Sequence, residues 1–236
     1  MNKKKSKALW LASLGLSSAL AISGGYLLIP HEGEVKSGDL HVVYADPVGI
    51  PTVCWGLTGK DLNNNPIVVG QKYTEEDCNK MFVQRIQEFE KQVDNLVKVD
   101  YSSDYQKAAL ISFSYNVGVG ALSSSTLLRK LNAGDHIAAC EELSRWVYAN
   151  RKKLNGLVTR RAEEKQWCLG DIPYDVKDVY EEIINMANVS AKSKSGQGNE
   201  QGGEKETQQE ANHSKPSSQP TNNNQCGWFK RVRGGC

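Results

Sequence analysis

The chain reads His31-Glu32-Gly33 just after an N-terminal apolar segment, and then Tyr44-Ala45-Asp46-Pro47-Val48-Gly49-Ile50-Pro51-Thr52-Val53-Cys54-Trp55-Gly56. These stretches place two carboxyl groups, Glu32 and Asp46, and the hydroxyl of Thr52 near the start of a domain. Two carboxyls that flank a glycosidic bond are the usual means of hydrolysing it, one as general acid and the other acting on water or on the sugar cation. The pattern therefore indicates glycosidase chemistry.

Composition divides the chain of 236 residues into segments. Residues 8–30 carry no charge, and residues 191–225 contain no Val, Ile, Leu, Met, Phe, Trp or Tyr. Roughly 150 residues remain between them, enough for one well-buried core. We therefore expect an N-terminal segment over 1–30, a catalytic domain over 31–172, an extra helix over 173–190, a disordered polar linker over 191–225 and a cationic tail over 226–236.

The segment from Ala8 to Pro30 has 23 uncharged residues, which as a helix would span a bilayer core of about 30 Å. The lysines at positions 3, 4, 5 and 7 would keep the N-terminus in the cytoplasm and send the rest outward. Cleavage after Ala19-Leu20-Ala21 as a signal peptide is one interpretation. Because 11 of the 23 residues are Ala, Gly or Ser, continuing to Gly25, we favour an uncut anchor that is later released. The preceding lysines argue against the third alternative, a buried core helix.

Hydrophobic periodicity predicts a mainly helical α+β fold. Residues 40–69 alternate like short strands and turns and indicate a small β-rich lobe. Thr74 and Asp77 resemble a capping box, and the apolar spacing that follows predicts an amphipathic helix over 75–97. Further helices are expected at residues 105–115, 126–131, from 135 to about 147, 158–167 (after a break at Gly156) and 177–188.

Six cysteines allow fifteen pairings, among which the sequence alone cannot choose. An exported protein can oxidise them, whereas metal ligation is disfavoured by the lack of a C-x-x-C motif and the scarcity of histidine. The economical local pairing is Cys54 with Cys78, Cys140 with Cys168 and Cys226 with Cys236.

Several segments together resemble the phage-type lysozymes, the endolysins of glycoside hydrolase family 24, over about residues 29–170. They are Glu32-Gly33, Asp46, Thr52, and the stretches 108–118, 124–132 and 156–161. The resemblance implies a lysozyme-like fold whose β-rich lobe carries the active site. One departure is the thirteen residues between Glu32 and Asp46, more than the family usually has, which turn residues around Ser37-Gly38-Asp39 explain as an insertion. Glu34 is the reserve candidate for the acid.

The resemblance also assigns roles to these residues. Glu32 would be the acid, because partial burial can keep a carboxyl protonated near working pH. Asp46 would act as base or charge stabiliser, with Thr52 as hydroxyl partner of the attacking water in an inverting mechanism. Each residue also has a simpler interpretation: Asp46 opens a good type I turn, Glu32 alone is a surface charge, and Thr52 alone is a strand residue.

Substrate contacts are expected from the helical part. The resemblance makes Asn116 a substrate contact, although it could simply cap a helix end. Arg160 or Arg161 could line the cleft and hold the carboxylates of peptidoglycan with paired hydrogen bonds. The alternative for this basic run is a solvated helix surface.

The resemblance implies a muramidase that hydrolyses the β-1,4 bond between N-acetylmuramic acid and N-acetylglucosamine for host lysis, without cofactor or metal. A lytic transglycosylase, or a non-catalytic murein- or membrane-binding protein on a lysozyme scaffold, are the alternatives. We expect a monomer without nucleic-acid partner, exported to the bacterial periplasm and first tethered to the inner membrane. The Cys-flanked tail could bind anionic lipid or lipopolysaccharide; an incidental frayed terminus is the other interpretation.

Overall fold

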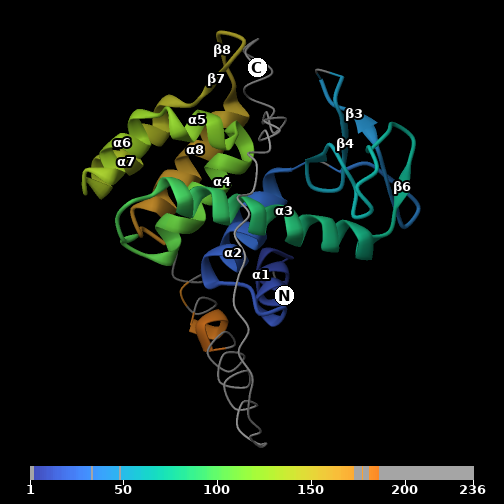
Figure 1. The fold of residues 1–236 in the computed structure, drawn as a ribbon, viewed down its shortest axis with the longest axis horizontal. Coiled ribbons are helices and arrows are strands. Elements are labelled where there is room, and N and C mark those ends of the chain that lie inside the picture. The colour runs from blue at the N-terminus through green and yellow to red at the C-terminus, as the bar shows by residue number, and fades with distance from the viewer. Residues whose placement is uncertain (1–2, 33, 48, 173–176, 178–180, 186–236) are drawn as a thin grey trace, which may run out of the picture.

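The computed structural model describes residues 3–32, 34–47, 49–172, 177 and 181–185. A small β-rich lobe and a larger helical lobe are joined by the long helix α3 (Glu75–Leu96), and the N-terminal helices lie against α3 (Figure 1). The α+β class expected from the sequence is confirmed. Gly33, most of the helix predicted over 177–188, the linker and the tail with Cys226 and Cys236 lie outside the described residues.

Helix α3 begins where the capping box predicts. The hydroxyl of Thr74 accepts a hydrogen bond from the backbone amide of Asp77, whose carboxylate in turn accepts one from the backbone amide of Thr74. Its apolar face packs on α4 (Asp104–Val117), which is buried along its middle. Gly118, with φ of +87°, ends α4 because a left-handed backbone suits glycine.

The remaining helices follow the predicted order with two corrections. Gly156 does not precede the last helix but lies in its first turn. The predicted helix after Asp135 stops early and continues as a 3-10 turn. The elements are α5 (Val119–Ser123), α6 (Thr126–Asn132), α7 (His136–Glu141), the 3-10 helix η3 (Glu142–Arg145) and α8 (Asn155–Cys168).

The β-rich lobe contains two small antiparallel sheets. One has the order β1-β2-β6, and the other, β3-β4-β5, pairs Thr52 with Tyr44 on one side and Thr58 on the other. A further hairpin, β7 with β8, was not predicted. The strands are β1 (Lys36–Ser37), β2 (Leu40–Val42), β3 (Tyr44–Ala45), β4 (Pro51–Val53), β5 (Leu57–Thr58), β6 (Lys72–Tyr73), β7 (Tyr148–Ala149) and β8 (Lys152–Lys153).

The N-terminal apolar segment is buried inside the domain, the alternative that the sequence disfavours. It forms α1 (Lys3–Ser13), α2 (Ser18–Ile22), a π-helix η1 (Ser23–Leu28) and a 3-10 turn η2 (Ile29–His31). Its apolar side chains belong to the same buried cluster as those of α3, α4 and α8. Within the described part of the chain, none of the helices combines the length and the apolar character needed to cross a membrane.

Small residues let the N-terminal segment fold back on itself. A Cβ atom added to Gly25 would lie 2.6 Å from the backbone of Ala8, so α1 crosses η1 too closely for any side chain there. The abundance of Ala, Gly and Ser, which weakens the segment as a membrane anchor, thus also permits tight packing in the folded domain.

The N-terminal lysines pair with acidic residues of the domain. Lys4 contacts Glu163 at 3.2 Å, and Lys7 contacts Glu75 at 3.0 Å. Lys7 also lies 4.8 Å from the centre of the Trp55 ring, within cation–π range. Charges that would keep the N-terminus in the cytoplasm therefore hold α1 against the domain in this structure.

Two of the predicted disulfides are confirmed. Cys54 is bonded to Cys78, and Cys140 is bonded to Cys168. The first ties the β-rich lobe to the beginning of α3, and the second ties α7 to the end of α8. Each closes a loop of moderate length and restricts the unfolded chain.

Candidate active site

Glu32 lies directly after η2, at the junction between the buried N-terminal segment and the β-rich lobe. Its Oε1 atom accepts a hydrogen bond from Nη1 of Arg160 at 2.7 Å, and its side chain is 18% exposed. On the other side it meets the turn at Gly56, where a Cβ atom would lie 2.6 Å from Glu32 Oε2. Gly56 has φ of +78°, so both the backbone conformation and the space require glycine. The carboxyl group is thus held between α8 and the β4–β5 turn.

Arg160 is fixed by a second, fully buried carboxylate. Its Nε atom donates to Glu164 Oε1 at 3.2 Å, while Ser112 of α4 donates to the same oxygen at 2.7 Å. Arg161 Nη2 also donates to that oxygen at 3.0 Å. Burial opposes the charge on Arg160, but Glu32 and Glu164 outweigh it and raise the Arg160 pKa. Two arginines and two glutamates therefore form a compact, charge-balanced network.

The structure brings Asn116 into this network. Its Oδ1 atom accepts a hydrogen bond from Nη2 of Arg161 at 3.0 Å. Burial lowers the pKa of Arg161 to about 10, although Glu164 acts in the opposite direction. The side chain of Arg161 is 1% exposed and that of Arg160 6%, so neither guanidinium offers the open surface that binding a substrate carboxylate requires. The structure instead places them on Glu32 and Glu164.

Asp46 and Thr52 lie on the hairpin formed by β3 and β4. Asp46 Oδ1 accepts a hydrogen bond from the backbone amide of Ile50 at 2.8 Å, and the backbone amide of Gly49 donates to the Asp46 carbonyl at 2.8 Å. The turn interpretation of Asp46 therefore holds. Thr52 is buried, and its hydroxyl donates to the Ile50 carbonyl at 3.0 Å. The hairpin fixes both side chains in one small unit.

The charge of Glu32 raises the pKa of two tyrosines, Tyr44 and Tyr115. Burial raises the pKa of Tyr44, and the negative charges of Glu32 and Asp46 raise it further. Tyr115 of α4 is buried, which raises its pKa, and the charge of Glu32 adds to the effect; its hydroxyl donates to the Trp55 carbonyl at 2.9 Å.

The reserve acid Glu34 faces a different group of residues. Its Oε2 atom lies 3.5 Å from His41 Nδ1 and 3.7 Å from Lys36 Nζ, on the β-rich lobe. Glu32 thus makes the contact with Arg160. His41 is also near Cys54 and Cys78, the one trio of metal-ligand residue types that the described residues bring together, but these two sulfurs are bonded to each other.

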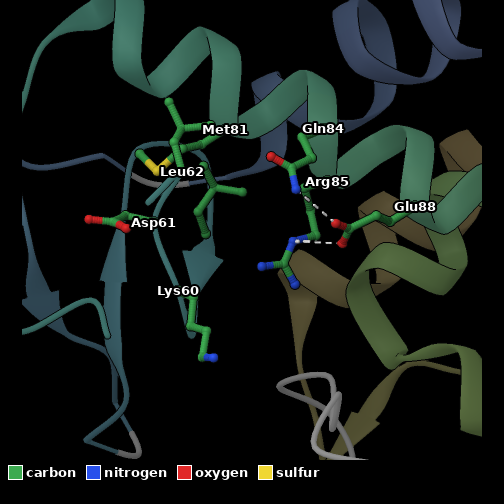
Figure 2. Close-up of a pocket in the computed structure, with 8 residues that line it drawn as sticks. Lys60, Asp61, Leu62, Met81, Gln84, Arg85 and Glu88 are labelled. Carbon is green, nitrogen blue, oxygen red and sulfur yellow. Dashed lines mark hydrogen bonds and ion pairs between the residues drawn. The ribbon is translucent and has the colours of Figure 1, made fainter. Parts of the chain in front are cut away.

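Three residues near the site were missed by sequence reasoning: Tyr115, Glu164 and Arg85. Glu164 lies three and four residues after the two arginines, a spacing that puts carboxylate and guanidinium on one helix face and could have been noticed. Arg85 extends from α3 and donates from Nη2 to the carbonyl of Thr58 at 3.1 Å. Figure 2 shows it in a small pocket between α3 and the β-rich lobe. No sequence pattern near Arg85 indicates this contact with β5, because Thr58 lies 27 residues away in the chain.

A fold of this kind, with a glutamate side chain at the junction of a helical and a β-rich lobe, is that of a lysozyme. Residues 37–164 match the phage lysozyme family. This matched range begins after Glu32 and includes Asp46, Thr52, Asn116, Arg160 and Arg161. The chain belongs to the phage lysozyme family and is a lysozyme-type glycoside hydrolase.

Relatives and solved structures agree with this assignment. The chain is 41% identical over 156 residues to the SAR-endolysin of Bacteriophage PS119, covering 63% of this chain and 90% of that protein. It is 39% identical over 164 residues to the SAR-endolysin of Enterobacteria phage P21, covering 66% of this chain and 96% of that protein. P22 lysozyme superposes with a TM-score of 0.53 at 30% identity, covering 65% of this chain and 97% of the other.

Proposed function

We propose that this lysozyme is a phage endolysin that hydrolyses the β-1,4 bond between N-acetylmuramic acid and N-acetylglucosamine in peptidoglycan. The contact between Glu32 and Arg160 carries the proposal, because it holds one carboxyl at the junction of the two lobes. Asp46 and Thr52 lie on the β3–β4 hairpin, and the charges of Glu32 and Asp46 both raise the pKa of Tyr44. Two carboxyl groups and a hydroxyl that can hold a water molecule are the groups that glycoside hydrolysis needs.

In the proposed reaction Glu32 donates its proton to the glycosidic oxygen as the bond to the muramyl anomeric carbon breaks. A water molecule, hydrogen-bonded to Thr52, attacks that carbon and transfers a proton to Asp46. Asp46 also stabilises the positive charge that develops on the sugar ring. Arg160, held by Glu164, keeps the carboxyl of Glu32 in place throughout. Attack by water from the face opposite the leaving group inverts the anomeric centre.

The direct test is the loss of turbidity of purified peptidoglycan with the oxidised, full-length protein. Glu32→Gln keeps the shape of the side chain but removes its acidic proton, and it should abolish activity. Glu34→Gln is the matched control and should retain activity, because Glu34 faces His41 and Lys36. Activity that persists in Glu32→Gln and disappears in Glu34→Gln would transfer the acid role to Glu34.

A lytic transglycosylase would cleave the same bond without water and leave an anhydro sugar end. The presence of Asp46 and Thr52 in addition to Glu32 favours hydrolysis. Product mass separates the two reactions, because an anhydro end is lighter by one water molecule.

We further propose that the enzyme is exported to the periplasm on its N-terminal segment and remains tethered to the inner membrane until that segment is released. The relatives are named SAR-endolysins, and the segment is apolar and preceded by lysines. In the membrane the residues of this segment could not occupy the core that they fill here. Glu32, two residues after Pro30, would then lose its position between Arg160 and Gly56. Equal specific activity in membrane and soluble fractions would contradict this.

The Cys-flanked tail over 226–236 remains proposed as a binding segment for anionic lipid or lipopolysaccharide. It has two aromatic residues, three cationic residues and no acid, a composition suited to an anionic interface. Deleting the tail should weaken binding to anionic vesicles while hydrolysis of soluble murein fragments continues. Unchanged vesicle binding would remove the idea.

A further inference from the structure

Murein carries carboxylates, yet the two arginines expected to bind them are buried against Glu32 and Glu164. We propose that Arg85, together with Lys60, forms the site that binds a carboxylate of the murein substrate. The inference rests on the proposed function, cleavage of murein, and adds to it a receptor for the charge of the substrate.

Arg85 lies close to the turn that contacts the proposed acid, Glu32. Arg85 Nη2 donates to the carbonyl of Thr58 at 3.1 Å. Thr58 lies two residues after Gly56, the residue against which the Glu32 carboxyl packs. Two residues of chain span at most about 7 Å, so Arg85 lies within reach of the sugars that flank the cleaved bond. Consistent with this, the charges of Glu32 and Arg85 both act on Tyr115.

A pocket surrounds Arg85. One wall is a single face of α3, and the other is β5 with the loop that follows it. Figure 2 shows the ends of Arg85 and Lys60 both pointing away from the axis of α3. The cavity itself holds about 30 Å³, room for a small group. Its lining is Leu57, Lys60, Asp61, Leu62, Met81, Gln84, Arg85 and Glu88.

The guanidinium of Arg85 is held in a fixed orientation before any ligand binds. The Thr58 carbonyl fixes one edge of the guanidinium, and Glu88 Oε2 lies 3.7 Å from Nε, too far for a good hydrogen bond. The side chain is 23% exposed, so part of its planar fork is open to a ligand. A guanidinium held in this way binds a carboxylate with two parallel hydrogen bonds and loses little entropy in doing so.

The pocket is lined by two cations, Arg85 and Lys60, and two acids, Asp61 and Glu88; Glu88 forms an ion pair with Arg85 at 3.7 Å, on its Nε side. Lys60 is exposed and adds a second cation, held by Asn64 at 2.9 Å from its Nζ atom. The carboxylate of Asp61 accepts hydrogen bonds from the backbone amides of its own loop, and in Figure 2 it points away from Arg85. Asp61 therefore leaves the cationic edge accessible to an anionic ligand.

The test compares two substrates with two variants. Arg85→Gln removes the charge, and Lys80→Gln removes an exposed charge from the same helix as a control. The substrates are intact murein and murein whose carboxyls have been converted to amides. We expect Arg85→Gln to raise the KM for intact murein about tenfold, the equivalent of about 1.4 kcal/mol, and to match the wild type on amidated murein. Lys80→Gln should match the wild type on both.

An equal loss by Arg85→Gln on both substrates would mean that Arg85 supports the fold of the lobe, and no loss on either would mean that it does not contact substrate; both results overturn the proposal. Peptide-free glycan strands identify the carboxylate: an effect that persists there assigns it to the lactyl ether, and one that disappears assigns it to the stem peptide. A wild-type protein that cleaves no murein would contradict the proposed function instead.

Discussion

Glu164→Gln should be strongly destabilising, because Glu164 is the buried anion for two buried cations. Its side chain is 1% exposed, as is that of Arg161, and that of Arg160 is 6% exposed. Arg160 Nη2 and Arg161 Nη1 are already buried without a hydrogen-bond partner among the described residues. The glutamine amide would retain one oxygen acceptor but turn its NH₂ group toward guanidinium donors, leaving an uncompensated buried charge.

Breaking a buried ion pair from one side costs about 3–5 kcal/mol. For a domain of this size, 1 kcal/mol shifts the melting temperature by about 2–4 °C, so Glu164→Gln should melt roughly 10 °C lower. Thermal unfolding of the oxidised protein, followed by circular dichroism, measures this. Glu141→Gln is the control: Glu141 of α7 is 50% exposed and pairs with Lys165 of α8, so the loss should stay below about 1 kcal/mol. A Glu164→Gln protein as stable as the control would show that Glu164 does not stabilise the two buried arginines.

Three further predictions concern other parts of the molecule. Gly56→Ala should displace the carboxyl of Glu32 from its position between α8 and the β4–β5 turn, since the new Cβ would lie 2.6 Å from its Oε2; we expect activity to fall by more than tenfold, measured as murein clearing, with a stability loss of about 1–2 kcal/mol. Gly25→Ala should destabilise the domain by about 1–3 kcal/mol in denaturant unfolding, because its Cβ would meet the backbone of Ala8; an unchanged midpoint would contradict the close crossing. Glu75→Gln should flatten the loss of stability in acid, measured as melting temperature against pH.

The sign of the Glu75 effect follows from its partners. Burial alone would raise its pKa, but hydrogen bonds from His41, Lys7 and Lys36 lower the pKa of Glu75 to about 2. A carboxyl with a depressed pKa stabilises the fold above its ordinary pKa of 4.5 and loses that contribution as pH falls toward 2. Glu76→Gln, at the next and more exposed position, should keep the wild-type pH dependence. Identical curves for wild type and Glu75→Gln would contradict the role of these contacts.

Local signals predicted much of the fold. The capping box at Thr74 and the apolar spacing after it gave α3, and turn chemistry located the strands of the β-rich lobe, because these features depend on residues close in sequence. The burial of the N-terminal segment in the folded domain was not predicted, for a physical reason. An apolar run rich in Ala and Gly is suited both to a bilayer and to a tightly packed core, and its composition does not distinguish the two.

The candidate site was predictable where it depends on order along the chain. Glu32, Asp46 and Thr52 could be proposed from their sequence and their resemblance to a family. Their partners could not, because Arg160 lies 128 residues from Glu32, and charged residues on a helix are most often solvated. Burial turned Arg160 and Arg161 from expected substrate contacts into supports for Glu32, and Arg85 became visible when α3 was placed beside β5.

In the proposed mechanism Glu32 protonates the glycosidic oxygen while water attacks the muramyl carbon. The most direct measurement is mass spectrometry of the fragments released from murein in heavy-oxygen water, with the wild type and Glu32→Gln side by side. The wild type should give one heavy oxygen at each new reducing muramyl end, and Glu32→Gln should release no fragments. Anhydro ends without the label, or labelled fragments from Glu32→Gln, would contradict it.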